Sequence, residues 1–174
     1  MPKIIEQLRE RLMLEAKKQM HEQGYAETTI RSVAAACGVG VGTVYNYFKS
    51  KEMLIATVVY EDWKKYLQRM SDIPIDDERI LLRGIFDSLR QFSCDYERLF
   101  SDSDAAKLVS VGSSARHKML RDQIASFILP LCEKNRVSSP DFTAKFIAES
   151  IICWSMEEKN FDELYSILEK IIKT

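Results

Sequence analysis

The stretch from Thr29 to Phe48 reads TIRSVAAACGVGVGTVYNYF, and its pattern decides the fold of the N-terminal region. Apolar side chains at positions 30, 33, 34 and 37 lie on one face of a two-turn helix. Positions 41, 44, 45 and 48 repeat that spacing after the intervening Gly-Val-Gly. Two short helices joined by a glycine-containing turn of three or four residues predict a helix-turn-helix.

Residues 3–23, which precede this stretch, carry a longer helical pattern. Apolar side chains recur every three or four residues, at Ile5, Leu8, Leu12, Ala16 and Met20. Gly24 ends the pattern, as a glycine just past the last turn commonly does. Thr28 and Thr29 then provide hydroxyl groups that can cap the helix beginning at Ile30. The region before residue 50 is therefore expected to hold three helices.

The remainder of the chain shows one helical pattern after another and no credible strand. Ser50 is expected to cap a helix reaching about Met70, followed by a linker over residues 71–74. Later helices are expected near residues 81–92 (capped at Asp76 or Asp77), 94–100, 120–131, 140–154 and 161–172. The third of these patterns, over residues 120–131, extends back toward residue 103, with an interruption at 112–114. The sequence therefore predicts an all-α fold, with a helix-turn-helix domain over residues 1–50 and a helical regulatory and dimerisation domain over residues 51–174.

Composition agrees with this organisation and excludes several classes of protein. The 174 residues are 46% apolar and 29% charged, which allows a substantial core, and the six glycines and four prolines argue against a sandwich or barrel. The net charge of -1 excludes a uniformly basic coat. Residues 1–51 nevertheless carry a balance of +3 against -4 for the rest, as expected when one end of a chain meets a polyanion.

The cysteines, histidines and apolar runs predict a cytoplasmic protein that does not enter a membrane. The longest apolar run, residues 53–60, is far shorter than the ~20 residues that span a bilayer. Cys37, Cys94, Cys132 and Cys153 are widely separated, and the chain has only two histidines. This spacing predicts reduced thiols and neither a metal site nor a cofactor.

The second helix of the helix-turn-helix has an informative outward face. If positions 41, 44, 45 and 48 pack inward, then Gly42, Thr43, Asn46 and Tyr47 point outward. These residues are small or able to form hydrogen bonds, as a DNA-reading surface requires. An ordinary solvated helix face is the alternative interpretation.

Three runs of sequence resemble the DNA-binding module of the tetracycline-repressor (TetR) family. They are GYAETTIRSVA from Gly24, CGV from Cys37 and GTVYNYFKSKEML from Gly42. The likeness is colinear across about residues 5–60 and is only architectural beyond them. It implies a helix-turn-helix over residues 29–48, with residues 41–48 in the major groove of double-stranded DNA.

The resemblance also implies roles for individual side chains. Thr43 and Tyr47 match residues that contact DNA in the family, while Tyr45 packs its ring inward and offers its hydroxyl to a phosphate. Asn46 can read the edge of an adenine, and Lys51 matches a lysine that contacts phosphate. Including the residues near the start of the preceding helix, the expected DNA-binding set is Thr28, Thr29, Arg31, Gly42, Thr43, Tyr45, Asn46, Tyr47, Lys49 and Lys51.

Two departures from the family pattern lie close to this surface. The family usually has a serine and a longer polar or basic residue where this chain has Gly40 and Val41. Those differences remove a helix cap and a DNA contact, so they lower the expected affinity or specificity. Met20 replaces a common aromatic residue, which is a tolerable exchange in a core.

The later helices suggest a homodimer. Apolar residues between Phe146 and Trp154 cover more than one helix face, so we expect that segment to be buried on more than one side. Its second side meets either a partner subunit, our hypothesis, or the centre of its own core. The expected interface residues are Phe146, Ile147, Ile151, Trp154, Leu164 and Leu168.

The resemblance further implies a repressor that a small-molecule effector releases from an inverted-repeat operator. The effector would bind one of two dimer conformations more tightly than the other. Seven aromatic residues could line its pocket, although each could equally belong to the core: Trp63, Tyr66, Phe86, Phe92, Tyr96, Phe127 and Trp154.

Three rival functions remain. An enzyme is disfavoured because the chain contains no phosphate-binding loop and no recognisable acid–base cluster. A redox sensor would use cysteines, but Cys37 lies at an inward position and Cys153 in a largely apolar run, where thiols are usually inert. A protein-interaction module that has lost DNA binding is the third rival, suggested by Gly40 and Val41.

Overall fold

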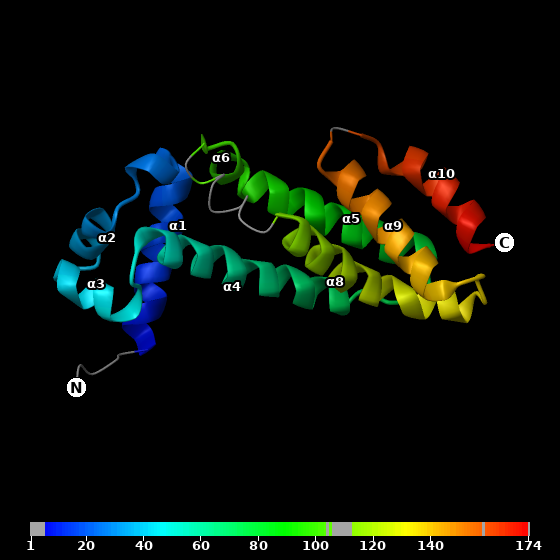
Figure 1. Cartoon of the computed structure of the whole chain (residues 1–174), viewed down its shortest axis with the longest axis horizontal. Helices are drawn as coiled ribbons and strands as arrows, with labels where there is room; N and C mark the ends of the chain where they lie inside the picture. The colour runs from blue at the N-terminus through cyan, green and yellow to red at the C-terminus, as the bar shows by residue number, and fades with distance from the viewer. Residues whose placement is uncertain (1–5, 104, 106–112, 158, 174) are drawn as a thin grey trace. The chain divides into compact units, whose positions relative to one another are not determined.

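The computed structural model describes residues 6–103, 105, 113–157 and 159–173, and these residues form helices and no strand. The predicted all-α fold is confirmed, and the beginning predicted near residue 103 for the helix over residues 120–131 falls mostly outside the described residues. The helices, drawn in Figure 1, are α1 (Glu6–Glu27), α2 (Ile30–Ala36), α3 (Val41–Tyr47), α4 (Lys51–Ser71), α5 (Glu78–Asp95), α6 (Glu97–Phe100), α8 (Ser113–Lys134), α9 (Pro140–Ser155) and α10 (Phe161–Ile172).

Packing divides the chain into two compact units. The first comprises residues 1–64 and 96–111, and the second comprises residues 65–95 and 112–174. Helix α4 therefore contributes residues to both units, and α6 belongs to the first. The boundary expected between residues 50 and 51 does not coincide with this division into packing units, and it stays a prediction.

In the first unit, α1 supports both helices of the helix-turn-helix. Gly24 adopts φ 89° and ψ 174° inside α1, so regular helical geometry ends at this residue, where the sequence predicted the end. A short core joins the three helices, because short helices gain most of their stability from packing an apolar face. Its most buried members are Leu12, Ala16, Val33, Ala34, Val44 and Phe48.

A buried carboxylate links α1, α4 and α6 inside the same unit. Asp62 is only 7% exposed, and it accepts a hydrogen bond from the Tyr96 hydroxyl at 2.7 Å and pairs with the Lys17 ammonium at 2.5 Å. Arg98 of α6 donates to the backbone carbonyls of His21 and Glu22 in α1. Because buried polar groups are costly without partners, this network fixes α6 against α1 and α4.

The second unit is built around α5, α8, α9 and α10. Helices α8 and α9 lie side by side, and α9 also packs against α5 and α10 (Figure 1). The core draws on all four helices and includes Leu82, Ile85, Ile124, Ile128, Ile147, Ile151, Leu164 and Leu168. The hydroxyl of Tyr165 in α10 donates to Glu78 in α5 at 3.0 Å. Burial and this hydrogen bond raise the pKa of Tyr165 to about 12.

Candidate nucleic-acid interface

A reciprocal cap fixes the beginning of α2. The Thr29 hydroxyl accepts a hydrogen bond from the Ser32 amide, and the Ser32 hydroxyl accepts one from the Thr29 amide, both at 3.0 Å. The Ser32 hydroxyl also lies 2.6 Å from the side-chain oxygen of Gln19 in α1, to which it donates. The start of α2 is thus tied to α1 by side chains as well as by its apolar face.

The turn between α2 and α3 closes with a Schellman motif. The Gly38 amide donates to the carbonyl of Ala35, and the Val39 amide donates to the carbonyl of Ala34. Gly38 adopts φ 70°, a conformation that a side chain disfavours. From α1, Arg11 donates to the carbonyl of Cys37 at 3.0 Å, which anchors the end of α2. The turn therefore sets the direction in which α3 leaves.

Helix α3 buries one side and exposes a polar face. Val44 and Phe48 are buried, whereas Gly42 and Asn46 are exposed. Thr43 and Tyr47 are half-buried at the edge of this face. The predicted outward direction is confirmed for Gly42 and Asn46 and holds in part for Thr43 and Tyr47, and the face offers hydroxyl and amide groups without a large aliphatic side chain.

The inward prediction for Tyr45 is wrong, and that for Val41 holds only in part. Tyr45 is 45% exposed, and Val41 is half-buried. On a seven-residue helix, the arc between Val44 and Phe48 is narrow enough for α1 and α2 to cover it. Positions 41 and 45 fall at the border of this arc, so their side chains stay partly exposed to solvent. The Tyr45 ring therefore lies beside the polar face.

Thr28 was expected to contact the DNA backbone, but its side chain is inside the unit. It is 1% exposed, and its hydroxyl donates to the carbonyl of Gly24 at 2.8 Å. The backbone amide of Thr28 donates to the same carbonyl at 3.3 Å, so Thr28 closes the chain back onto Gly24 through both its amide and its hydroxyl. Thr28 is therefore a structural residue, whereas Thr29 and Arg31 are exposed.

Two lysines follow the polar face. Lys49 donates to the carbonyl of Tyr45 at 3.4 Å, near the end of α3. The Lys51 ammonium donates to the carbonyl of Ala26 and lies 4.0 Å from the centre of the Tyr25 ring. Both cations are held on the first unit by backbone carbonyls, and the second is also held by an aromatic face.

The cysteines do not form a reactive cluster in the described residues. Cys37 is buried as expected, and burial raises the pKa of its thiol. Cys153 was expected to be buried in an apolar run, but the structure leaves it exposed because the covered side of α9 carries Ile147 and Ile151 instead. Partial desolvation and Glu149 raise the pKa of Cys153, which disfavours the reactive thiolate.

The aromatic residues expected to line an effector pocket are distributed over both units. Trp63 and Tyr96 belong to the first unit, whereas Tyr66, Phe86, Phe92, Phe127 and Trp154 belong to the second. Several already have partners within their own unit. Tyr66 and Phe92 meet edge to face at 5.4 Å, and Phe86 meets Phe161 in the same way.

A cavity in the second unit is lined by other residues. It has a volume of about 440 Å³, and its walls carry carboxylates, cations and one tyrosine. The lining residues are Asp76, Asp77, Glu78, Arg79, Leu131, Lys134, Asn135, Tyr165 and Lys173. None of the seven expected aromatic residues is among them, so the effector pocket stays a prediction.

Most residues expected at the dimer interface are buried within the single chain. Ile147, Ile151, Leu164 and Leu168 are each less than 5% exposed, because α9 and α10 pack against each other and α5 packs against both. Those four residues belong to the core, as the alternative interpretation held, and their assignment to an interface is wrong. Phe146 is 49% exposed and Trp154 is half-buried, so these two remain available.

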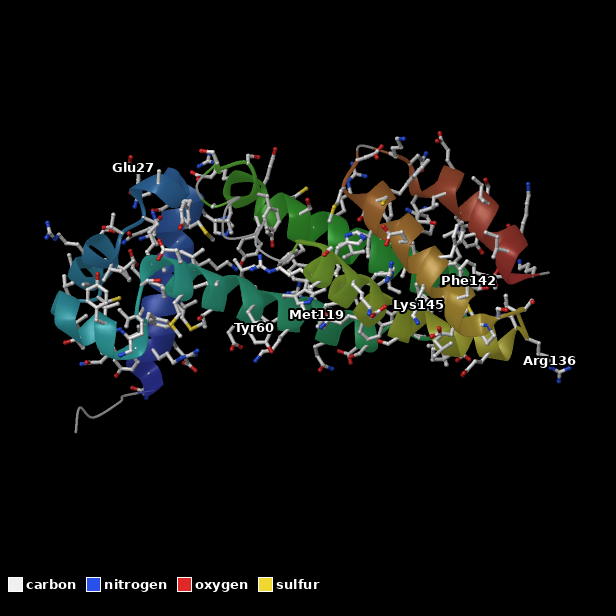
Figure 2. The ribbon with its side chains drawn as sticks, viewed as in Figure 1. Glu27, Tyr60, Met119, Arg136, Phe142 and Lys145 are labelled. Carbon is white, nitrogen blue, oxygen red and sulfur yellow. The ribbon has the colours of Figure 1, made fainter. Side chains whose placement is uncertain are left out.

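The exposed side of α9 carries residues that were not singled out in the sequence. Phe142 is 71% exposed and Met156 is 60% exposed (Phe142 is labelled in Figure 2). Together with Phe146 and Cys153 they follow a helical spacing of four, seven and three residues, which places them on one stripe. That spacing was a usable signal, although it did not tell which stripe the rest of the chain leaves open.

Comparisons with known proteins show what the N-terminal region is similar to. Residues 12–58 match the family described as bacterial regulatory proteins, tetR family. The transcriptional regulator UidR of Escherichia coli K12 is 29% identical over 68 residues, which cover 39% of this chain and 34% of UidR. The fatty acid metabolism regulator protein of Bacillus subtilis is 33% identical over 51 residues, covering 29% of this chain and 26% of that protein.

The chain spans about a third of the length of UidR, so this likeness concerns the N-terminal region. Solved structures extend the likeness in fold. A TetR-family regulator from Pectobacterium atrosepticum has 22% identity and a TM-score of 0.63, covering 95% of this chain and 90% of its own. A Rhodococcus protein assigned to the same family has 14% identity and a TM-score of 0.68, covering 97% and 100%.

The fold and its polar helix define a helix-turn-helix protein with a helical body. Its N-terminal module, over residues 12–58, is similar to the tetR family of bacterial regulatory proteins. Within the described residues, no helix is both long and apolar enough to cross a membrane. The described residues also contain no group of three or more ligating side chains that could hold a metal ion.

Proposed function

We propose that this chain is a sequence-specific DNA-binding transcriptional regulator that acts in the cytoplasm. The observation that carries the proposal is the exposed polar face of α3, whose opposite side packs into the core of the helix-turn-helix. The family match and the names of the relatives, which are transcriptional regulators, support it. The major groove admits an α-helix, and hydrogen-bonding side chains on that helix can read base edges.

The proposed contacts come from three segments of the first unit. Helix α3 contributes Gly42, Thr43, Tyr45, Asn46 and Tyr47, with the two tyrosines at opposite edges of its face. The start of α2 contributes Thr29 and Arg31, where free amides favour phosphate. Lys49 and Lys51 follow α3 as phosphate-binding cations. Thr28 is left out because its hydroxyl is already used inside the unit.

We further propose that the regulator is a homodimer that covers the exposed stripe of α9. A large apolar patch left in water is costly and commonly marks an interaction surface. Phe142, Phe146 and Met156 provide that patch, and Met119 on the neighbouring α8 is also 55% exposed (Figure 2). A two-fold pair of readers matches the inverted-repeat operators that such dimers bind.

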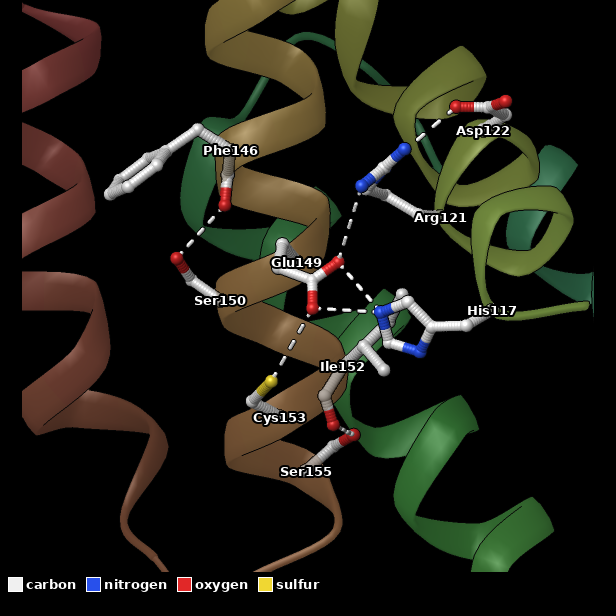
Figure 3. A network of polar contacts seen from close by, with 9 residues as sticks. All are labelled: His117, Arg121, Asp122, Phe146, Glu149, Ser150, Ile152, Cys153 and Ser155. Carbon is white, nitrogen blue, oxygen red and sulfur yellow. Dashed lines mark hydrogen bonds and ion pairs between the residues drawn. The ribbon is translucent and has the colours of Figure 1, made fainter. Parts of the chain in front are cut away.

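Charged residues lie next to the stripe and give it a polar margin. Figure 3 shows Glu149 of α9 directed at His117 and Arg121 of α8, with Cys153 on its other side. The Glu149 carboxylate lies 2.8 Å and 2.9 Å from the Nε2 atom of His117. It lies 3.9 Å from the Arg121 guanidinium. An apolar patch beside paired charges is the arrangement expected of a specific interface.

A small-molecule effector is the third part of the proposal. Its chemistry is not assigned, because the fatty acid metabolism regulator protein, whose name states a pathway, matches only 29% of this chain. Helix α4 contributes residues to both packing units, so a ligand in the second unit can act on the first through this continuous helix. Such a ligand must bind one conformation better than the other, with a coupling of ~1–3 kcal/mol.

Recovery of bound fragments from sheared DNA of the source organism tests the DNA-binding proposal. The full chain is expected to recover one or a few inverted-repeat sites. A Thr43→Ala/Tyr47→Ala variant should lose them, whereas the matched control Thr57→Ala/Tyr60→Ala on α4 should keep them. Equal recovery by both double variants would show that α3 is not the reader.

The rival functions are separated by simple measurements. A redox sensor requires that peroxide change DNA affinity, and the raised pKa values of the Cys37 and Cys153 thiols lead us to expect no change. A protein-interaction module requires weak DNA binding without a steep salt dependence, because phosphate neutralisation releases counterions. We expect the steep dependence. No enzymatic activity is part of the proposal.

A further inference from the structure

The centre of the exposed face of α3 is formed by Gly42 and Asn46, which lie one helical turn apart. The buried residues Val44 and Phe48 mark the opposite side of the helix. Tyr45 is exposed at one edge of the face, and Tyr47 is half-buried at the other. Any partner of α3 therefore meets Gly42 and Asn46 first, with an aromatic ring on either side.

Nothing within the first unit requires a glycine at position 42. A Cβ atom added there would have no heavy-atom neighbour within 4 Å, and the residue has ordinary helical geometry. Glycine in the middle of a helix is less favourable than alanine because it loses more backbone freedom. The absent side chain leaves the backbone of α3 uncovered at this position, which allows another molecule to approach it closely.

Asn46 is the side chain best placed to use that approach. It is exposed, and its amide group makes no hydrogen bond to any residue that the structure describes. An amide presents one donor and one acceptor side by side, which matches the N6 and N7 atoms of adenine in the major groove.

The face also lacks the groups that read guanine most often. Residues 41–47 contain no arginine or lysine, which are the usual bidentate partners of guanine O6 and N7. The cation that follows α3, Lys49, is directed at the carbonyl of Tyr45. The methyl group of Thr43 at the edge of the face is suited to contact with the methyl group of a thymine.

We infer that α3 selects an A·T pair in each half of the operator, with the Asn46 amide on adenine N6 and N7 and Gly42 allowing the close approach. This inference rests on the proposed function and adds the base that the reader distinguishes. The two tyrosines at the edges hold the helix against the phosphates and carry no base preference.

Selection from a random duplex library, followed by single-atom changes in the selected site, tests the inference. The full chain should select sites with an invariant adenine in each half. Replacing that adenine by 7-deazaadenine, which lacks the N7 acceptor, should weaken binding by ~5- to 150-fold. Asn46→Ala should bind the natural and the 7-deaza sites equally.

Gly42→Ala provides a second, independent variant. It should fold with unchanged or slightly higher thermal stability, because the added methyl group meets open space. Its affinity for the selected site should fall by an order of magnitude or more. Wild-type affinity in this variant would overturn the close approach at position 42.

The outcomes separate this inference from the function on which it rests. If the full chain selects no site, the proposed function fails and the inference fails with it. If it selects a site and Asn46→Ala retains the same base preference and the same sensitivity to 7-deazaadenine, only the inference is overturned. Selection of an invariant guanine opposite α3 would also overturn it.

Discussion

The α2–α3 and α8–α9 connections use the same turn for different purposes. Each preceding helix closes with a Schellman motif, formed by Gly38 and Val39 after α2 and by Arg136 and Val137 after α8. Each following helix begins at a residue without a side-chain cap, Gly40 for α3 and Ser139 for α9. The same type of backbone turn therefore precedes both α3, the proposed DNA-reading helix, and α9, a helix of the second unit.

The residues placed on that shared backbone differ. The reader has glycine where φ is positive, whereas the body has Arg136 at φ 55° and Ser139 at φ 53°. Helix α3 has seven residues and a polar exposed face, and α9 has 16 residues and an aromatic one. The short α3 therefore depends on its packing against the rest of the first unit, whereas the longer α9 tolerates strained residues in the turn before it.

The largest expected effect comes from placing charge on the exposed face of α9. Phe142→Glu/Phe146→Glu should abolish the dimer, because two carboxylates per chain cannot be buried against their copies. Affinity for an inverted-repeat operator should then fall ~100-fold or more, since the two readers are no longer linked. Sedimentation and DNA titration measure both effects.

The control for this prediction places the same charges elsewhere in the second unit. Ile75 and Ile80 are 44% and 56% exposed, so Ile75→Glu/Ile80→Glu should leave assembly unchanged. A dimer that survives the Phe142/Phe146 substitutions would show that the exposed face of α9 is not the dimer interface.

The second prediction concerns the network that supports α1 under the reader. Asp62→Ala should lower the free energy of unfolding by about 2–3 kcal/mol, because it leaves the Tyr96 hydroxyl buried without its acceptor and Lys17 without its ion pair. Tyr96→Phe should cost only about 1 kcal/mol. Urea denaturation measures both, and equal costs would show that Asp62 is not the centre of the network.

The third prediction reverses the residues of the two turns. Gly38→Ala should cost about 1 kcal/mol, because a side chain is strained at φ 70°. Arg136→Gly should stabilise by about 0.5 kcal/mol, since relief of strain at φ 55° exceeds the added freedom of the unfolded chain. Effects of the same sign would mean that the two turns are not equivalent in energy.

The smallest expected effect tests the missing cap of α3. Gly40 is in an extended conformation, and an added Cβ would lie 3.9 Å from the nearest side-chain atom, so Gly40→Ser introduces no clash. The new hydroxyl should accept from the amide of Gly42, since the amide of Thr43 already donates to the carbonyl of Gly40, and should stabilise by a few tenths of a kcal/mol. Thermal unfolding measures it, and a decrease would show that the glycine is needed for another reason.

Local signals in the sequence predicted most of the fold. Thr29, Ser50 and Asp77 each cap a helix within a few residues, and α2, α4 and α5 begin where these residues indicated, whereas Gly24 breaks the regular geometry of α1 before its end at Glu27. The polar face of α3 was predicted for the same reason, because a helical period places side chains without knowledge of distant neighbours.

The errors share a cause, which is dependence on packing between distant segments. The direction of Tyr45 depends on how much of α3 is covered by α1 and α2. The exposed side of α9 depends on α5, α8 and α10, so Ile147 and Ile151 could not be told from Phe142 by spacing alone. The hydroxyl of Thr28 donates to the carbonyl of Gly24, a contact that depends on how the chain turns back after Gly24.

The position of Lys51 has a further consequence for the energetics of DNA binding. Its ammonium is already held by the carbonyl of Ala26 and the face of Tyr25, so the long side chain has lost much of its rotational freedom before DNA arrives. A phosphate contact from Lys51 therefore carries a smaller entropic penalty than one from a freely rotating lysine. Leu in place of Tyr25 would leave the charge unchanged and make the same contact entropically more costly.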